Sequence, residues 1–117
     1  QLNEFIKKCK NSGYYVCLSN PTFEIFLMMH DDIIFELDKK EMLENKRTGS
    51  GKRGKRFLEL KVSETFGCSK TNLKFEKFML NIKKAINNEK KFCENLEELK
   101  DELGSNVGKI LDEMIED

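Results

Sequence analysis

The sequence has no tryptophan, a single proline and a single histidine. It also lacks an apolar run of about 18 residues, the length that a membrane-spanning helix needs. A secretory signal pattern, with a basic start followed by an apolar stretch, is not found either. These absences favour a cytoplasmic protein that has no membrane partner.

The cysteines are few and widely spaced. Cys9, Cys17, Cys68 and Cys93 form no C-x-x-C pair, and the histidine, His30, is distant in sequence from most of them. This spacing argues against a zinc site and against a disulfide framework. Because Cys9 and Cys17 occupy apolar positions of the pattern, we predict small buried thiols in a reducing compartment.

Charge of one sign is not in excess, because 21 basic residues balance 21 acidic ones. A zero net charge gives no general electrostatic attraction to nucleic acid, although a local basic patch remains open. Charged residues nevertheless make up 36% of the chain, well above the usual share of about 25%. We therefore expect long helix faces that are covered by solvent.

One domain, residues 1–117, is the natural organisation for a chain of this length. The patterns predict a helix, a strand, a helix, a charged loop and then three or four packed helices, which is an α-rich α/β fold. Since one strand cannot form a sheet, its partner would come from Ile33–Phe35, from another chain or from residues before Gln1. We expect the C-terminal part of a larger domain.

The segment after Gly13 is typical of a strand that leads into a helix. Tyr14–Leu18 is short, aromatic and β-branched, which predicts a buried strand of a parallel sheet. Ser19 and Asn20 are good N-cap residues, and Pro21 suits the first helical position. A helix that begins here directs free backbone N–H groups toward the turn.

Glu24 is the one residue between Phe23 and Met29 that is not hydrophobic. A buried charge is costly unless it is paired, bound to a ligand or protonated. In one interpretation, Glu24 stabilises the helix N-terminus and accepts hydrogen bonds from nearby N–H groups. In the other, it is a metal ligand or a catalytic group, since open α/β sheets bind ligands at the carboxyl ends of their strands.

Residues 46–56 form a strongly basic loop without apolar or acidic residues. Its basic residues are Lys46, Arg47, Lys52, Arg53, Lys55 and Arg56. Such a loop cannot pack, so we predict that it is flexible. It is either an arm that contacts the phosphates of DNA or RNA or a solvated insertion. Gly49, Gly54 and Lys55 also match part of a P-loop, but Arg56 replaces the Ser or Thr that binds magnesium, which argues against nucleotide binding.

Helical periodicity dominates the remaining sequence. Phe57–Phe66 predicts a helix that Gly67 ends, and Leu73–Ile86 predicts a longer one. The polar face of the longer helix carries lysines, which are either solvated or directed at phosphates: Lys74, Lys77, Lys83 and Lys84. A short helix is expected around Leu96–Leu103, and a last one begins after Ser105 or Asn106.

Residues 19–30, which read Ser-Asn-Pro-Thr-Phe-Glu-Ile-Phe-Leu-Met-Met-His, resemble a motif of the RloB family. The family pattern is Ser-Asn-Pro-x-Phe-Glu, followed by an aromatic residue, leucines and a histidine. Phe26 stands where the family usually has tryptophan. Lys70, the helix containing Ala85–Asn88 and the closing segment Gly104–Leu111 add to the resemblance, which covers most of the chain and corresponds to the C-terminal half of the family domain.

RloB proteins are linked to restriction–modification loci and abortive infection in prokaryotes. The resemblance implies a Toprim-like core, with a nuclease that uses Mg²⁺ or Mn²⁺ to hydrolyse phosphodiesters in phage defence. Glu24 would then be a metal ligand and a catalytic residue. His30 is either a general base or a surface or capping residue. The family's earlier Glu and its Asp-x-Asp motif are not in this sequence, so the chain alone would lack most of the metal site.

A competing interpretation is a non-catalytic module. It would bind nucleic acid or a protein, associate with a missing N-terminal part, or form a homodimer. In the homodimer, the unpaired strand edge at Tyr14–Leu18 would supply the contact. A nuclease of the Toprim-like type needs two or more carboxylates that converge on a metal ion, and the sequence offers one candidate, Glu24.

Overall fold

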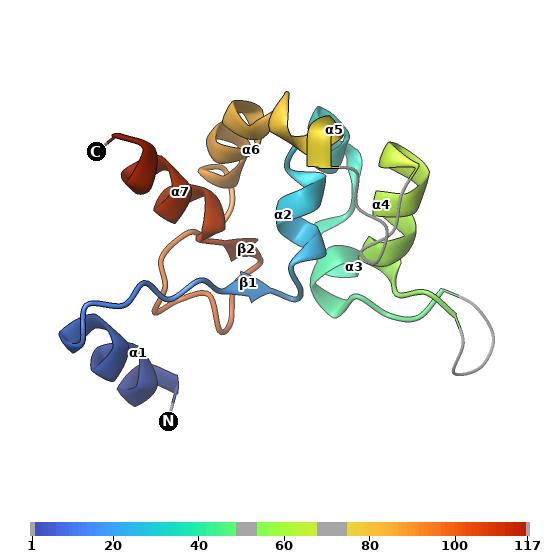
Figure 1. Ribbon diagram of the computed structural model, residues 1–117. Coiled ribbons are helices and arrows are strands. Elements are labelled where there is room, and N and C mark those ends of the chain that lie inside the picture. The colour runs from blue at the N-terminus through green and yellow to red at the C-terminus, as the bar shows by residue number, and fades with distance from the viewer. Residues whose placement is uncertain (1, 49–53, 68–74, 117) are drawn as a thin grey trace.

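The computed structural model describes residues 2–48, 54–67 and 75–116, and Figure 1 shows a helix-rich arrangement with one small sheet. The helices are α1 (Leu2–Asn11), α2 (Glu24–Met28), the 3₁₀ helix η1 (Asp32–Glu36), α3 (Lys39–Glu44), α4 (Phe57–Phe66), α5 (Phe75–Met79), α6 (Ile82–Glu89) and α7 (Val107–Glu116). The strands are β1 (Ser19–Asn20) and β2 (Gly104–Ser105). The expected α-rich character is therefore confirmed.

Several helices begin or end at strong local signals, whereas the helix predicted around Leu96–Leu103 is wrong, because these residues form turns. Helix α3 begins after Asp38, whose carboxylate accepts a hydrogen bond from the Glu41 backbone N–H at 3.0 Å. Helix α4 ends at Gly67, which adopts the left-handed conformation with φ 67°. The predicted long helix is divided, because α5 ends at Met79 and α6 begins at Ile82.

The predicted strand at Tyr14–Leu18 is wrong. These residues have no regular secondary structure, and the Tyr14 and Tyr15 side chains are 69% and 59% exposed. The strand β1 begins at Ser19, directly after this segment, and pairs antiparallel with β2, so that Ser19 faces Ser105. A short aromatic run has β propensity, but propensity produces a strand only where another strand supplies hydrogen bonds.

Two further predictions fail with that strand. Ser19 and Asn20 belong to β1 and are not helix caps, because α2 begins at Glu24 with Phe23 in the N-cap position. Residues 33–35 lie in η1 and so provide no partner strand. The strand edge through which a homodimer was expected to form does not exist at residues 14–18.

The core forms around α2, whose five residues are all buried. Figure 1 shows α2 in the middle of the molecule, where it packs against α4 and α6. Ile25 and Met28 have no exposed surface, and full burial of one such side chain stabilises the fold by about 1.5–3 kcal/mol. Other core residues are Leu27, Met29, Ile34, Met42, Leu58, Val62, Phe78 and Ala85.

The cysteine prediction holds only in part. Cys9, Cys17 and Cys93 are free thiols, but the predicted burial is wrong for both Cys9, which is half-buried, and Cys17, which is exposed because its segment is not a buried strand. Cys68 lies outside the described residues, as do Lys70 and Lys74. Within the part of the chain that the structure describes, none of the helices combines the length and apolar character that crossing a membrane requires.

Candidate functional site

The two segments that carry most of the RloB resemblance lie against each other. The Ser19 hydroxyl donates a hydrogen bond to the Ser105 hydroxyl at 3.1 Å, across the pairing of β1 and β2. The Asn106 side chain accepts from the Leu18 backbone N–H at 2.7 Å and donates to the Val16 carbonyl at 2.8 Å. Hydrogen bonds thus connect residues almost ninety positions apart in the sequence, and we call this contact of β1, β2 and Asn106 the joint.

Asn20 also has a structural role in this joint. Its side-chain amide donates to the carbonyls of Leu99 and Glu102, at 2.8 and 3.1 Å. Gly104 is required at the opposite strand, because a Cβ atom there would lie 1.9 Å from the Cys93 carbonyl oxygen. Asn20 therefore holds the segment before β2 in place, and both of its amide hydrogens have protein acceptors.

Glu89 is a buried carboxylate of this region that the sequence analysis missed. It has no exposed surface, and its two oxygens accept hydrogen bonds from the backbone N–H groups of Gly108 at 2.7 Å and Lys109 at 2.8 Å. Burial raises the pKa of Glu89 to about 7, although these bonds and one from Ser105 oppose the shift. Glu89 of α6 thus caps the N-terminus of α7.

The signal for Glu89 is present in the helical period. Ile82, Ala85 and Ile86 form the apolar face of α6, and Glu89 continues that face three residues after Ile86. A carboxylate on an apolar helix face is the signal that singles out Glu24, and Glu89 carries the same signal. The partner groups on α7 lie nineteen and twenty residues further along the chain, which the period does not reveal.

Glu24 lies at the first position of α2 and is 7% exposed. Within residues 2–48, 54–67 and 75–116, its carboxylate has no hydrogen-bond or ion-pair partner. Two positions earlier, the Thr22 hydroxyl oxygen is buried and, among the described residues, also has no partner. Among the described residues, the segment between β1 and α2 thus carries a buried hydroxyl at Thr22 and a carboxylate at Glu24 that have no protein partner.

His30 lies in the core, so the surface alternative is wrong, whereas the alternative of a capping residue is confirmed. It is 3% exposed, and its ring packs edge-on against Phe26 and Phe78, with centroids 5.1 Å apart in both pairs. Its Nδ1 lies 3.1 Å from the carbonyl oxygens of Phe26 and Leu27, so it caps the end of α2. Burial lowers the pKa of His30, which favours the neutral ring with Nδ1–H as donor.

The candidate catalytic residues lie at opposite ends of α2. Glu24 and His30 are six residues apart, which corresponds to about 9 Å along a helix axis. No group of three or more His, Cys, Asp or Glu side chains that could hold a metal ion occurs among the described residues. The described part of this chain therefore does not provide a complete site for Mg²⁺ or Mn²⁺, which prefer several oxygen ligands.

The basic loop is built on two paired arms, which we call the basic hairpin: residues 46–48 and 54–56. The Thr48 N–H donates to the Lys55 carbonyl at 2.8 Å, and the Phe57 N–H donates to the Lys46 carbonyl at the same distance. Arg47 and Arg56 form an antiparallel bridge. The two arms are therefore paired with each other, while Lys52 and Arg53 lie outside the described residues; the flexibility of the loop stays a prediction.

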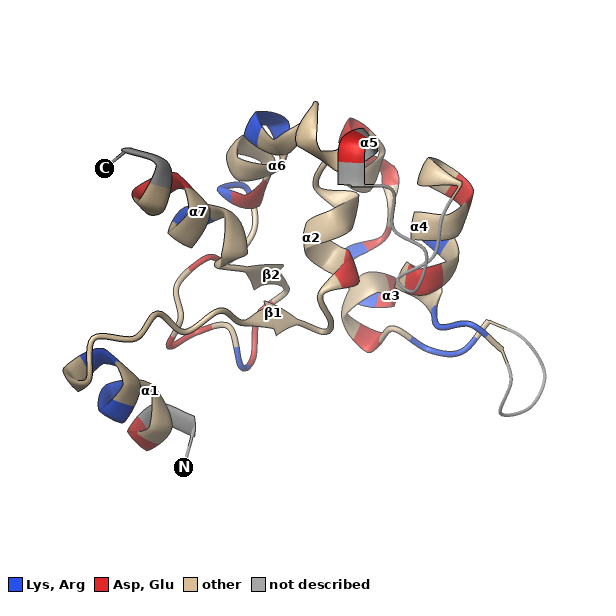
Figure 2. Ribbon diagram, in the orientation of Figure 1, with Lys and Arg blue, Asp and Glu red and all other residues tan. Residues whose placement is uncertain are grey.

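The base of the hairpin is fixed by Asn45, which is 3% exposed. Asn45 ends α3 in the left-handed conformation with φ 47°, and its side chain accepts a hydrogen bond from the Leu58 N–H at 2.9 Å. Arg56 donates from its guanidinium to the Asn45 carbonyl at 3.1 Å. Figure 2 shows Lys and Arg on both arms where they leave the body of the molecule.

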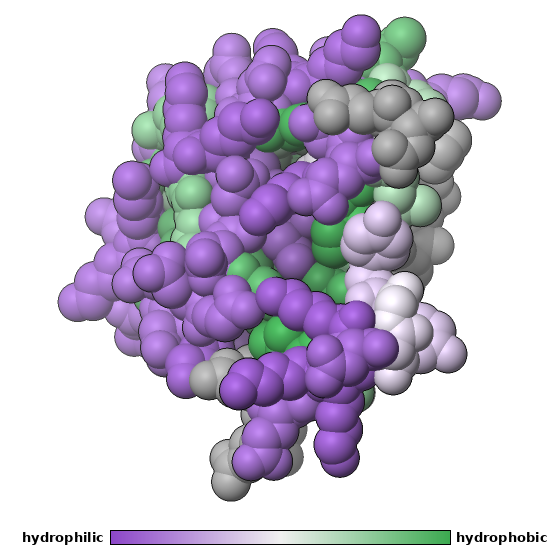
Figure 3. All heavy atoms as spheres, turned by 90° about the vertical axis from the view of Figure 1, so that its left-hand side faces the viewer, coloured by the Kyte–Doolittle hydropathy of each residue, from purple (hydrophilic) through white to green (hydrophobic). Residues whose placement is uncertain are grey.

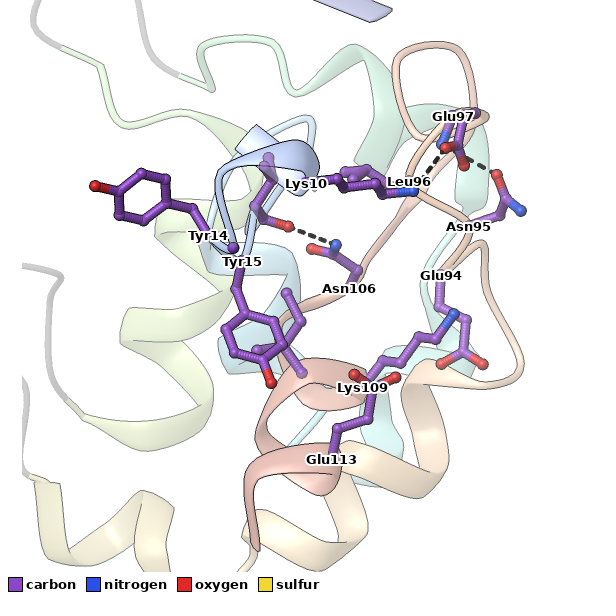
Figure 4. Close-up of a pocket in the computed structure, with 13 residues that line it drawn as sticks. Lys10, Tyr14, Tyr15, Glu94, Asn95, Leu96, Glu97, Asn106, Lys109 and Glu113 are labelled. Atoms are coloured by element: carbon purple, nitrogen blue, oxygen red, sulfur yellow. Dashed lines mark hydrogen bonds and ion pairs between the residues drawn. The ribbon is translucent and has the colours of Figure 1, made fainter. Parts of the chain in front are cut away.

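A pocket of about 440 Å³ lies between the segment after α1, residues 94–97 and α7. Its apolar lining includes Val16, Leu96 and Ile110, and hydrophobic atoms lie between hydrophilic side chains on this face in Figure 3. Charged side chains surround it, and Lys10 pairs with Glu97 at 3.0 Å. Figure 4 shows the rim that these groups form. The sequence does not reveal this pocket, because its walls come from three segments that are distant in the chain.

The geometry thus contains a joint between two motif segments, a mostly buried carboxylate at Glu24, an exposed basic hairpin and a pocket with a charged rim. Each is built from residues that the fold brings together, and none by itself identifies a reaction. Comparison with known proteins gives no further assignment: no protein-family model, no curated protein and no solved structure matches this chain.

Proposed function

We propose that the chain is part of an RloB-like phage-defence protein and that it binds DNA or RNA by the phosphates through the basic hairpin. The observation that carries this proposal is the pairing of the two arms, which presents Lys46, Arg47, Lys55 and Arg56 together on an ordered base. Ordered arms lose less conformational entropy when they bind than a free loop loses.

The charge of the hairpin supports phosphate binding in a chain with zero net charge. Lys46, Arg47, Lys55 and Arg56 are exposed, and the sequence adds Lys52 and Arg53 to the same stretch. One acidic side chain offsets part of this charge, since Glu44 pairs with Lys46 at 2.9 Å. The pair is exposed, and such pairs contribute little to stability, so a phosphate can compete for Lys46.

A double variant, Lys46→Gln with Lys55→Gln, tests this proposal. The backbone groups of these residues join the arms, so the substitutions remove charge and leave the pairing intact. Each phosphate contact contributes about 0.9 to the slope of log affinity against log salt on duplex DNA. We expect the slope, measured by fluorescence anisotropy between about 50 and 200 mM salt, to become shallower, with a decrease of about 2 in its absolute value.

The matched control is Lys100→Gln, which removes an exposed lysine from the segment before β2. We expect this variant to retain the affinity and the salt slope of the unmodified chain. If Lys100→Gln and the hairpin variant weaken binding equally, the binding reflects general charge, and the hairpin is not the interface. A chain that binds neither DNA nor RNA at low salt contradicts the proposal entirely.

A second candidate function is the metal-dependent phosphodiester hydrolysis that the RloB resemblance implies. The observation that favours it is the mostly buried Glu24 carboxylate, which has no partner among the described residues, beside the buried Thr22 hydroxyl. A carboxylate in this setting suits one ligand position of a metal site whose other ligands come from another part of the protein. Bound Mg²⁺ or Mn²⁺ would supply Lewis-acid chemistry and an activated water.

Metal binding can be tested directly, by titrating the chain with MnCl₂ in a calorimeter. Because Glu24 is one ligand of an incomplete site, we expect weak, saturable binding that Glu24→Gln abolishes. Glu98→Gln, which removes an exposed carboxylate, should leave the binding unchanged. Equal binding by the chain and by Glu24→Gln would remove Glu24 from the metal site, and the non-catalytic binding module would then be the better interpretation.

A further inference from the structure

Two phenylalanine rings and two lysines form a layered cluster on the surface, at one end of α3. The rings of Phe35 and Phe92 are stacked, with centroids 5.8 Å apart and planes inclined by 9°. The Lys91 ammonium lies 4.8 Å from the centre of the Phe35 ring, and the Lys39 ammonium lies 5.6 Å from the centre of the Phe92 ring. We call these four residues the Phe–Lys cluster.

The cluster is more exposed than the aromatic pairs of the core, as is the Phe23 ring, which is 46% exposed beside Phe26. Phe26 and Phe78 are 3% and 7% exposed, whereas Phe35 is 42% exposed. An aromatic side chain gains stability by burial, so an exposed ring held in a fixed stack keeps a surface that another planar group can use. The four residues come from η1, the start of α3 and the segment after α6, which the fold brings together.

The position of the cluster connects it to the basic hairpin. Helix α3 begins at Lys39 and ends at Glu44, and Asn45 alone separates it from Lys46. Its six residues span about 9 Å, at a rise of about 1.5 Å for each residue. Lys40 and Lys46 both approach Glu44, at 4.0 and 2.9 Å. A single strand that contacts the hairpin could therefore reach the cluster within about three nucleotides, at a rise of about 3.4 Å for each.

We propose that the Phe–Lys cluster binds an unpaired base of single-stranded nucleic acid, an inference that rests on the proposed function. The base would stack on the Phe35 ring, and the ammonium groups of Lys39 and Lys91 would contact the flanking phosphates. Stacking on an aromatic ring does not depend on base identity, because every base has a flat face. In this arrangement the exposed Lys91 side chain exchanges its ring contact for a phosphate contact.

The acidic groups around the cluster are largely engaged. Asp32 accepts from the Asn88 side chain at 3.2 Å and lies 3.6 Å from the Lys84 ammonium. Asp38 caps α3. Glu36 is an exposed carboxylate of η1, and its charge opposes phosphate binding. The lysines that adjoin the cluster, Lys40 and Lys90, are also exposed and add positive charge.

The test compares single-stranded and duplex oligonucleotides of the same sequence, as DNA and as RNA, by fluorescence anisotropy. Phe35→Ala should weaken binding of the single strand about tenfold, which is the usual effect of losing one stacked base, and change duplex binding less than twofold. Phe35→Tyr keeps a ring and should retain the affinity. Leu80→Ala, which truncates a side chain that is 87% exposed outside the cluster, is the matched control.

The outcomes separate this inference from the proposed function. Unchanged single-strand binding by Phe35→Ala, or an equal loss on both nucleic acids, overturns the cluster as a stacking site and leaves the hairpin proposal intact. A specific loss with Phe35→Ala, together with no effect of the hairpin double variant, supports the cluster and contradicts the hairpin. No binding of either nucleic acid by the unmodified chain overturns both. A circular dichroism melt confirms that each variant is folded.

Discussion

Glu24 and Glu89 are both buried carboxylates, but their surroundings differ. Glu24, at the start of α2, is 7% exposed and has no partner among the described residues. Glu89, at the end of α6, has no exposed surface and accepts hydrogen bonds from Gly108 and Lys109 on α7. The comparison shows that burial alone does not mark a functional carboxylate. Glu89 is structural because the protein fills its acceptors, whereas the Glu24 oxygens are not among the fully buried polar atoms without a partner in the described part of the chain and can accept from water or from a ligand.

The largest expected effect is the loss of stability in Glu89→Ala. This change leaves the backbone N–H groups of Gly108 and Lys109 without acceptors and opens a space between α6 and α7. An unsatisfied buried donor costs about 1–3 kcal/mol, so we expect a loss of about 4 kcal/mol in the free energy of unfolding, measured by urea denaturation. A loss below about 1 kcal/mol, typical of surface positions, would show that Glu89 does not hold α7.

The next effect is the dependence of stability on pH. The unfolded chain releases the Glu89 proton near the ordinary pKa of 4.5, whereas the folded chain holds it until about pH 7. Between these values the folded state binds more protons, so the free energy of unfolding falls as the pH rises through this window. We expect Glu89 to contribute a decrease of about 3 kcal/mol, obtained from urea denaturation of the chain and of Glu89→Gln at several pH values.

The titration of His30 changes the free energy of unfolding in the opposite direction to that of Glu89, and so provides an internal control. The pKa of His30 is lowered from 6.5 by burial, so the unfolded state binds the proton first and stability falls as the pH drops below 6.5. Since the chain has one histidine, its imidazole NMR signals report this pKa without overlap. A titration midpoint at or above 6.5 would contradict the buried position of the ring.

The smallest expected effect is that of Glu24→Ala on stability. Because no hydrogen bond or ion pair of this carboxylate is found among the described residues, its removal should change the free energy of unfolding by less than about 1 kcal/mol. The same urea series as for Glu89→Ala measures it. A loss as large as that of Glu89→Ala would show that Glu24 has a structural partner, and the difference between the two carboxylates would disappear.

The parts of the fold that were predicted correctly have strong local signals. Gly67 ends α4, and α7 begins at Val107, directly after Ser105 and Asn106. Each depends on residues within a few positions, so the sequence contains the whole signal. The unusual burial of Glu24 was also visible, since a charge interrupts an apolar run.

The failures concern contacts between distant residues. Tyr14–Leu18 has the composition of a strand, but the partner strand β2 lies opposite Ser19 and Asn20, so the aromatic run remains exposed. The spacing of Glu89 places it on the apolar face of α6, but the spacing does not predict its hydrogen-bond partners on α7. The pocket and the Phe–Lys cluster were likewise invisible, because each is assembled from three separate segments.

The sequence by itself determined the helix-rich class, the end of α4 at Gly67, the apolar segment of α2 with its carboxylate, and the basic character of residues 46–56. Only the tertiary structure decided which buried carboxylate has partners, where the short sheet forms, and that the arms of the basic hairpin are paired. The physical reason is range: caps and periodicity act within one or two turns, whereas strand pairing and the pairing of buried charges depend on groups that only the folded chain brings together.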